Sequence, residues 1–167
     1  KFRTGWLGSV NEMAPPTASG HAEESPEGRA YAAAITAVMC GQAYKTSALI
    51  ASRMIAFPQY KKNRKPMLDV IDKHGKHVDK IQKKYISNEL FSAAKNIWND
   101  AYSLGSEHGY KNAQVTVIAP TGTIAFMMDC DTTGIEPDLA LVKHKKLVGG
   151  GVLKIVNNTI PEALKRL

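Results

Sequence analysis

The sequence predicts an α/β protein that is mainly helical and carries a few short strands towards its C-terminal end. Apolar residues recur at steps of three and four through the first two-thirds of the chain, which is the period of an amphipathic helix. After residue 110 they gather instead in short, β-branched runs bounded by Gly and Pro, as strands do. The 167 residues are 44% hydrophobic and 22% charged, as in an ordinary globular domain. This composition excludes a wholly disordered tail, a collagen-like repeat and a disulfide-stapled mini-protein.

The first predicted helix follows a polar lead-in. Residues 1–25 contain Pro, Gly and many Ser, Thr and Glu, so we expect a loop or a mobile lead-in there. Ser25 is a suitable N-cap, and the proline after it suits the first position of a helix. We expect a helix over residues 26–39, a break at Gly41 and a second helix over residues 42–55.

Two amphipathic helices are predicted next. The third helix opens near Asn63, with Pro66 in its first turn, and its other face is rich in lysine. The fourth helix has Asn88 as its N-cap and stops at Gly109. Because both apolar stripes are one-sided, we interpret them as packing surfaces.

The last third of the chain predicts strands and turns. Residues 114–119 form a nearly continuous apolar run, which indicates a buried strand. Residues 139–147 and 152–156 predict two strands on either side of a run of three glycines. Asn158 or Thr159 would cap a final short helix.

The charge balance favours an anionic partner. The chain has 22 Lys and Arg against 15 Asp and Glu, which gives a net charge of +7. Such an excess suits a phosphorylated small molecule, a nucleic acid or an acidic protein surface. A basic, solvated face without a partner is the alternative.

The cysteines and histidines predict neither a disulfide framework nor a metal site. Cys40 and Cys130 lie far apart and form no CxxC pair, as expected for a reducing, cytoplasmic compartment. His74 and His77 share a predicted helix, but their lysine neighbours would repel a cation, so we expect no metal. No run approaches the ~20 apolar residues of a membrane span, and we expect no membrane partner.

The turn at residues 120–123, Pro-Thr-Gly-Thr, is the most informative arrangement for function. It follows the predicted strand and precedes a predicted helix start. Gly122 lets the backbone approach a ligand closely, Thr121 and Thr123 offer hydroxyl donors, and the start of a helix favours a phosphate. No lysine follows, which excludes a P-loop. The alternative is an ordinary strand-to-helix turn capped by threonine.

An acidic loop follows this turn. Asp129, Asp131 and Glu136 lie within eight residues, and paired carboxylates can bind Mg²⁺. The spacing is not that of a calcium loop, and we expect cap and hydrogen-bond roles that fix a tight loop beside the turn. The same carboxylates disfavour the thiolate of Cys130, so we do not expect this cysteine to be a nucleophile.

These residues belong to two stretches that closely resemble the adenosylcobalamin-dependent (class II) ribonucleotide reductases. Residues 112–124 read NAQVTVIAPTGTI and residues 128–138 read MDCDTTGIEPD. The similarity continues through ALVKHKKLVGGG at 140–151 and KIVN at 154–157. Shorter matches lie upstream, at GRAY (28–31), AITAVM (34–39) and NRKPM (63–67).

The resemblance implies that residues 26–167 are a late, incomplete part of a catalytic domain, a ten-stranded α/β barrel. It implies an enzyme that converts ribonucleotides to deoxyribonucleotides by thiyl-radical chemistry, with adenosylcobalamin as cofactor and a ribonucleoside diphosphate as substrate. The remainder of the reductase chain would be a partner. In this family the turn holds the substrate phosphates, which assigns that role to Ala119, Pro120, Thr121, Gly122, Thr123 and Ile124.

The radical and redox cysteines of that family have no counterpart here. The family's radical cysteine lies in an Asn-x-Cys-x-Glu loop, whereas Val38 and Gln42 flank Cys40 at those positions, on a helical pattern. Cys130 belongs to the acidic loop. We therefore predict no catalytic residue in this chain and no activity of the chain alone.

Two other interpretations remain open. One is a basic helical module that binds nucleic acid or an acidic protein through the lysines of residues 61–84. Tyr60 and Tyr85 are the only aromatic residues interleaved there, which is weak support for base stacking, so nucleic acid is the less favoured partner. The other is a domain that folds without binding nucleotide. Because a lone strand at 114–119 would leave its edges uncovered, we expect self-association into a homo-oligomer.

Overall fold

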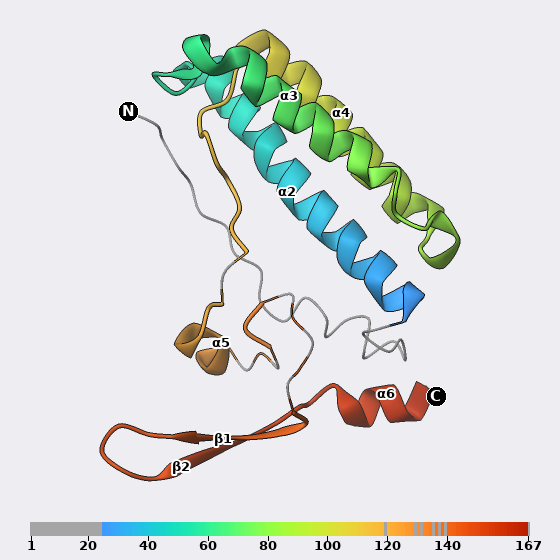
Figure 1. The fold of residues 1–167 in the computed structure, drawn as a ribbon, viewed down its shortest axis with the longest axis vertical. Helices are drawn as coiled ribbons and strands as arrows, with labels where there is room; N and C mark the ends of the chain where they lie inside the picture. Colours follow the sequence, from blue (N-terminus) through green and yellow to red (C-terminus); the bar gives the residue numbers. More distant parts are fainter. Residues whose placement is uncertain are drawn as a thin grey trace. The chain divides into compact units, whose positions relative to one another are not determined.

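The computed structural model describes residues 25–166 apart from residues 119, 129, 131, 135, 137 and 139. The predicted lead-in over residues 1–25 therefore lies outside the described residues, except for Ser25. The chain forms two compact units, whose described parts are residues 33–117 and, separately, residues 25–32 with 118–166. The elements, in chain order, are α2 (Pro26–Met54), α3 (Tyr60–Val78), η1 (Lys83–Tyr85), α4 (Asn88–His108), α5 (Thr123–Met127), β1 (Val142–Lys146), β2 (Val152–Val156) and α6 (Ile160–Arg166) (Figure 1).

Helix α2 is a single helix of 29 residues, so the predicted break at Gly41 is wrong. Its start is as expected, because the Ser25 hydroxyl accepts a hydrogen bond of 2.9 Å from the backbone N–H of Gly28. Gly41 is buried, and a Cβ there would lie 2.8 Å from Cγ2 of Ile97 and 3.0 Å from the ring of Trp98. Glycine at this position permits close approach to α4, and an interior glycine weakens a helix without ending it.

Helices α3 and α4 confirm the two predicted amphipathic helices, with shifted starts. Helix α3 begins at Tyr60, and Asn63 lies at a kink with φ −109° and ψ 17°, three residues before Pro66. Helix α4 is capped by Ser87 and not by Asn88, because the Ser87 hydroxyl accepts a hydrogen bond from the backbone N–H of Leu90 at 3.1 Å. Helices α2, α3 and α4 run side by side in Figure 1.

The core of the helical unit is built on aromatic rings. Tyr110 is completely buried and makes edge contacts with Tyr44 and Tyr60, with ring centroids 5.8 and 6.0 Å apart. Trp98 of α4 lies 6.1 Å from Tyr44, and its indole N–H donates to the carbonyl oxygen of Ala37 in α2. The Tyr110 hydroxyl donates to a backbone carbonyl within α4, which ties the chain after α4 back to that helix.

The C-terminal end of α2 has an unusual backbone. Ile55, the residue after the helix, has φ 60° and is 80% exposed. A β-branched residue is strained in this left-handed region. The Lys111 ammonium donates to the carbonyl oxygens of Met54 and Ile55, at 2.9 and 3.3 Å, and so satisfies acceptors at the helix end.

The predicted buried strand over residues 114–119 is not observed. The described residues 114–118 have single β-bridge positions at 114 and 117 and no continuous strand. Val115 is buried, but Ile118 is 76% exposed, so the run is not buried as a whole. A strand needs a neighbouring strand along its length, and apolar composition alone does not supply one.

The predicted hairpin is present. Strands β1 and β2 pair antiparallel with Val142 opposite Val156 and Lys146 opposite Val152. The tip contains Gly149, Gly150 and Gly151, with φ of 92°, 101° and 96°. Helix α6 then begins directly after Thr159, one of the two predicted cap positions.

A buried polar cluster joins the base of the hairpin to the start of α6. The Asp138 side chain is 6% exposed and forms an ion pair of 2.6 Å with Lys143 of β1. Its second oxygen accepts a hydrogen bond from the Asn157 side chain at 2.9 Å. Asn157 in turn accepts hydrogen bonds from the backbone N–H and the hydroxyl of Thr159. The three segments therefore share one network.

Candidate functional site

The Pro-Thr-Gly-Thr turn forms the local structure that its sequence predicts. Gly122 has φ 54°, a left-handed conformation that favours glycine, and α5 begins at the next residue. The backbone N–H of Ile124 donates to the carbonyl of Thr121 at 3.3 Å, and that of Ala125 donates to the carbonyl of Gly122 at 3.1 Å. The turn therefore passes directly into the first turn of a helix, as expected.

Thr121 links this turn to the loop that follows it. Its backbone N–H and its hydroxyl both donate to the carbonyl oxygen of Thr133, at 3.0 and 2.8 Å. Thr133 is held in turn by Glu136, whose carboxylate accepts from the backbone N–H of Thr133 at 2.9 Å and from its hydroxyl. Partial burial opposes the charged carboxylate, but the hydrogen bonds from Thr133, with a smaller contribution from Lys143, hold the pKa of Glu136 below its usual range.

The hydrogen-bonding role expected for Glu136 is therefore observed, and it fixes the loop beside the turn. Asp129 and Asp131, for which similar roles were expected, lie outside the described residues. Cys130 is half-buried, and its thiol is 3.7 Å from the carbonyl oxygen of Met128.

The upper surface of the turn is open. Among the described residues, no atom lies within 4 Å of the position that a Cβ would take on Gly122. Pro120 and Ile124 are exposed, the latter at 58%, while Thr121 is half-buried. The structure thus brings together five of the six predicted site residues in one exposed turn, and Ala119 lies outside the described residues. The hydroxyl of Thr121, which was expected to serve a ligand, donates to Thr133 instead. The donors that the turn offers to an oxyanion are therefore the backbone N–H groups of Gly122 and Thr123 and the Thr123 hydroxyl.

The other cysteine, Cys40, lies in the middle of α2. Its thiol is 3.2 Å from the hydroxyl of Thr116. Burial raises the pKa of the Cys40 thiol, and the hydrogen bond with Thr116 only partly opposes this effect. Cys40 is therefore held as a thiol within a helix and not on a loop.

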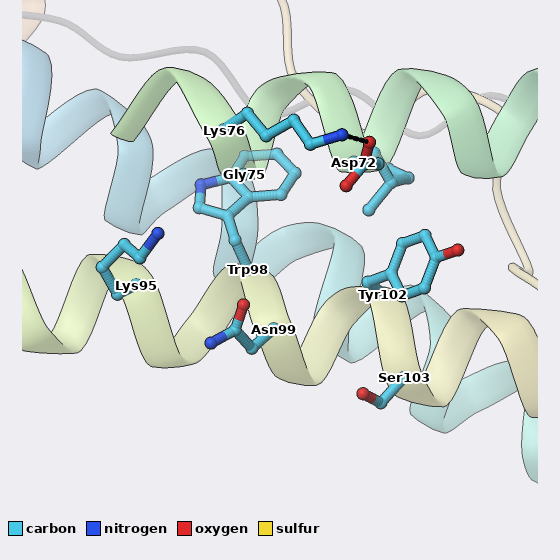
Figure 2. Close-up of a pocket in the computed structure, with 9 residues that line it drawn as sticks. Asp72, Gly75, Lys76, Lys95, Trp98, Asn99, Tyr102 and Ser103 are labelled. Atoms are coloured by element: carbon cyan, nitrogen blue, oxygen red, sulfur yellow. Dashed lines mark hydrogen bonds and ion pairs between the residues drawn. The ribbon is translucent and has the colours of Figure 1, made fainter. Parts of the chain in front are cut away.

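A cavity that the sequence did not predict lies between α3 and α4. Its volume is about 260 Å³. Ile71, Gly75 and Trp98 give it apolar walls, and polar side chains from both helices surround its opening (Figure 2). The polar lining residues are Asp72, Lys76, Lys95, Asn99, Tyr102 and Ser103. Asn99 and Ser103 are one helical turn apart and lie beside the apolar stripe of α4. This spacing is the sequence signal that could have identified the wall of the cavity that α4 contributes.

Neither a metal cluster nor a membrane span is found in the described part of the chain. No group of three or more His, Cys, Asp or Glu side chains there could hold a metal ion. No described helix is both long enough and apolar enough to cross a membrane.

Comparison with known proteins identifies the family. The family model for the ribonucleotide reductase barrel domain matches residues 3–167. The chain therefore belongs to the ribonucleotide reductase barrel-domain family, as its resemblance implied, and its helices and strands are part of such an α/β barrel domain.

Several relatives carry the name vitamin B12-dependent ribonucleotide reductase. The relative from Bradyrhizobium diazoefficiens is 48% identical over 182 residues, which cover 100% of this chain and 14% of the relative. The relative from Streptomyces coelicolor is 46% identical over 167 residues, covering 99% of this chain and 17% of the relative. The relative from Agrobacterium fabrum is 45% identical and covers 100% of this chain and 14% of its own length. The chain thus spans a small part of the length of each.

Proposed function

We propose that this chain is part of an adenosylcobalamin-dependent ribonucleotide reductase and contributes the turn that binds the phosphates of a ribonucleoside diphosphate. The observation that carries the proposal is identity of 45–48%, along essentially the whole chain, to reductases that are named for their dependence on vitamin B12. The matched region includes the exposed turn at residues 120–124.

The proposed phosphate-binding residues are Ala119, Pro120, Thr121, Gly122, Thr123 and Ile124. Three features of the turn support this role. Gly122 has a positive φ, and the open space around its Cβ position leaves room for a ligand. Thr121 is anchored to the next loop, so the turn is organised before a ligand arrives. The hydrogen-bond donors at the start of α5 are uncharged, and such donors can bind an anion even though the turn contains no lysine.

The cofactor belongs, in this proposal, to the remainder of the reductase chain. Cobalamin supplies the radical chemistry of such an enzyme when it is bound. Cys40 is held in a helix as a thiol, so we assign it no part in that chemistry. The chain's own residues would bind and orient the substrate. The two free cysteines support a reducing, cytoplasmic location.

The remainder of the reductase chain is also the partner that we propose for the apolar surface of residues 118–166. Among the described residues of this segment, twelve large apolar side chains are exposed, including Met127 at 83% and Val148 at 107%. In the isolated chain we expect this surface to pair with a second copy. Light scattering that gives the mass of a monomer at all concentrations would contradict self-association.

Nucleotide binding tests the proposed role of the turn. We expect ADP or CDP to bind the chain in calorimetry, with inorganic pyrophosphate as a competitor. Replacing Gly122→Ala strains the turn by about 1–2 kcal/mol and places a methyl group where the phosphate would lie. This variant should abolish binding, and Thr121→Ala should weaken it.

Gly150→Ala is the matched control, because Gly150 also has a positive φ and open space around its Cβ position. It should leave nucleotide binding unchanged. Equal loss of binding in the Gly122 and Gly150 variants, or nucleotide binding that pyrophosphate does not reduce, would refute the assignment.

A further inference from the structure

The positive charge of the chain is concentrated on α3 and the turn that follows it. Nine of the 22 Lys and Arg and three of the 15 acidic residues lie within residues 60–85, so this segment carries six of the seven net charges. All nine basic residues are exposed. The proposed nucleotide site, at residues 119–124, uses none of them.

Five of these lysines form a row along one side of α3 and of the turn that continues it to residue 80; we call this the lysine row. Its members are Lys62, Lys65, Lys73, Lys76 and Lys80. Their spacing places them opposite the buried face of α3, which carries Tyr60, Leu68, Ile71 and Val78. From its first to its last member the row extends about 27 Å at the rise of a helix.

The acidic residues of this segment are each held by a different lysine. Asp69 pairs with Lys65 at 2.9 Å, and Asp72 pairs with Lys76 at 2.5 Å. Asp79 pairs with Lys95 of α4 at 2.6 Å. These carboxylates therefore do not neutralise Lys73 and Lys80. Because the pairs are exposed, they contribute little stability and can exchange for a carboxylate from a partner.

The cavity between α3 and α4 opens beside the lysine row. Lys76 belongs to both, and Lys95 lies across the opening from it (Figure 2). Ile71 and Trp98 form the floor of the cavity but are only 0% and 3% exposed, so a partner meets mainly the polar side chains at its rim, among them Asn99 and Ser103. A partner that meets both features needs a row of negative charges with a hydrogen-bonding side chain next to it.

Two observations favour an acidic protein segment over a nucleic acid. Tyr60 is 8% exposed, and the Lys84 ammonium lies 4.4 Å from the ring centroid of Tyr85, so neither ring is a free platform for a base. Eight of the nine basic residues are lysines, whereas arginine makes the bidentate contacts that select phosphates and base edges.

We propose that the lysine row and the adjoining α3–α4 cavity form a docking surface for an acidic helix of a partner protein. A helix with Glu at every third and fourth position sets carboxylates against the lysines at the two ends of the row, which lie on either side of Asp69. One glutamine side chain of that helix reaches the opening of the cavity, where Asn99 and Ser103 offer hydrogen bonds.

The test uses a fluorescein-labelled model helix of about 18 residues, whose length matches the row. It carries Glu at every third and fourth position and one Gln at its centre. We expect its anisotropy to rise on addition of the chain, with affinity that falls as salt increases from about 50 to about 200 mM. Lys73→Glu with Lys80→Glu should weaken binding about tenfold, which is the effect of about 1.4 kcal/mol. Neutralisation of the same two residues to Gln should give a smaller loss.

The matched control is Lys146→Glu with Lys154→Glu, two exposed positions on the hairpin. Either double variant lowers the net charge from +7 to +3. Only the α3 variant should lose affinity for the peptide. Equal losses in both variants, or no binding at the lower salt concentration, would overturn the proposal. Tighter binding of a labelled DNA duplex of similar charge would overturn it in favour of a nucleic acid.

Discussion

Gly41 of α2 packs against Trp98 of α4 so closely that a Cβ on Gly41 would lie 3.0 Å from the indole ring. The same indole donates its N–H to the carbonyl oxygen of Ala37, one turn earlier in α2. Trp98 is also stacked with His74 of α3, with ring centroids 5.3 Å apart and planes 11° apart. The Trp98 side chain of α4 therefore contacts both α2 and α3 and sets the packing of the three helices.

Substitution of Gly41 should lower the free energy of unfolding. Gly41→Ala gains helix propensity, but its methyl group would meet Cγ2 of Ile97 at 2.8 Å, and overpacking costs about 1–3 kcal/mol. Urea unfolding should show a net loss. Gly75→Ala is the control, because its Cβ would lie at an ordinary 3.5 Å from Trp98, and we expect it to stabilise α3 by about 0.5–1 kcal/mol. A stabilised Gly41→Ala variant would contradict this packing.

Ile55→Gly should raise the stability of the helical unit. The residue has φ 60° and is 80% exposed, so the substitution removes backbone strain and little buried surface. We expect a gain of about 0.5–1 kcal/mol in thermal or urea unfolding, after the entropy of glycine in the unfolded chain is included. Ile50→Gly, within α2, should instead destabilise by about 1 kcal/mol. A loss of stability for Ile55→Gly would show that Ile55 is not strained.

The buried tyrosines predict lower stability at high pH. Burial, with a smaller effect of Cys40, raises the pKa of Tyr44 from 10.0 to about 12, and burial raises the pKa of Tyr110 as well. Below about pH 10 both the folded and the unfolded states keep these protons. Between that pH and the folded pKa the unfolded state loses protons that the folded state retains. The free energy of unfolding should therefore fall by up to about 1.4 kcal/mol per pH unit for each tyrosine.

Urea unfolding at about pH 9 and about pH 11 measures this loss. Tyr44→Phe removes one titrating group and should make the dependence on pH less steep. If the variant and the original chain lose the same free energy over this interval, Tyr44 does not keep its proton in the folded state.

Asp138→Asn should loosen the base of the hairpin. The substitution removes the charge that faces Lys143 at 2.6 Å, in a site where the aspartate side chain is 6% exposed. We expect a local loss of about 1–3 kcal/mol, visible as faster hydrogen exchange of backbone amides in β1 and β2. Asp69→Asn breaks the exposed pair with Lys65. It should change the free energy of local opening, measured by hydrogen exchange, by less than about 0.5 kcal/mol. Equal effects in both variants would show that the burial of Asp138 does not make its ion pair more important for stability than the exposed pair of Asp69.

The purified chain should not reduce nucleotides when it is supplied with adenosylcobalamin and a dithiol. Cys40 lies within α2, its thiol is hydrogen-bonded to the hydroxyl of Thr116, and burial raises the pKa of this thiol. Deoxyribonucleotide formation above a control without the chain would refute this prediction. In the complete reductase, Cys40→Ser should retain activity, because we assign no redox or radical role to this residue.

The helices were predictable because their apolar periodicity is local, but their ends were not. The break expected at Gly41 does not occur because a contact with Trp98, 57 positions along the chain, decides that position. The strand expected over residues 114–119 depends on neighbours that composition does not reveal. The hairpin was predictable because its turn glycines and its alternation are both local.

For the site, the conformation of Gly122 and the role of Glu136 followed from residue type and spacing. The double hydrogen bond from Thr121 to Thr133 joins two turns twelve residues apart, and no periodic pattern signals it. The α3–α4 cavity was missed for the same reason, since its walls come from two separate helices. The sequence thus predicted which residues could bind or position a ligand. The distances between those residues depend on tertiary packing and were not predictable.

The backbone at the tip of the hairpin restricts the chirality of the residues there, whereas the space around them does not restrict the size of their side chains. Gly149 and Gly150 have strongly positive φ angles, yet among the described residues nothing lies within 4 Å of either Cβ position. A D-alanine at either position takes up such a φ without strain, whereas an L-alanine does not. A chain assembled by chemical ligation could therefore carry mirror-image residues at its hairpin tip and keep the pairing of β1 with β2. The constraint at this tip is one of stereochemistry, and the side chain itself is free to vary.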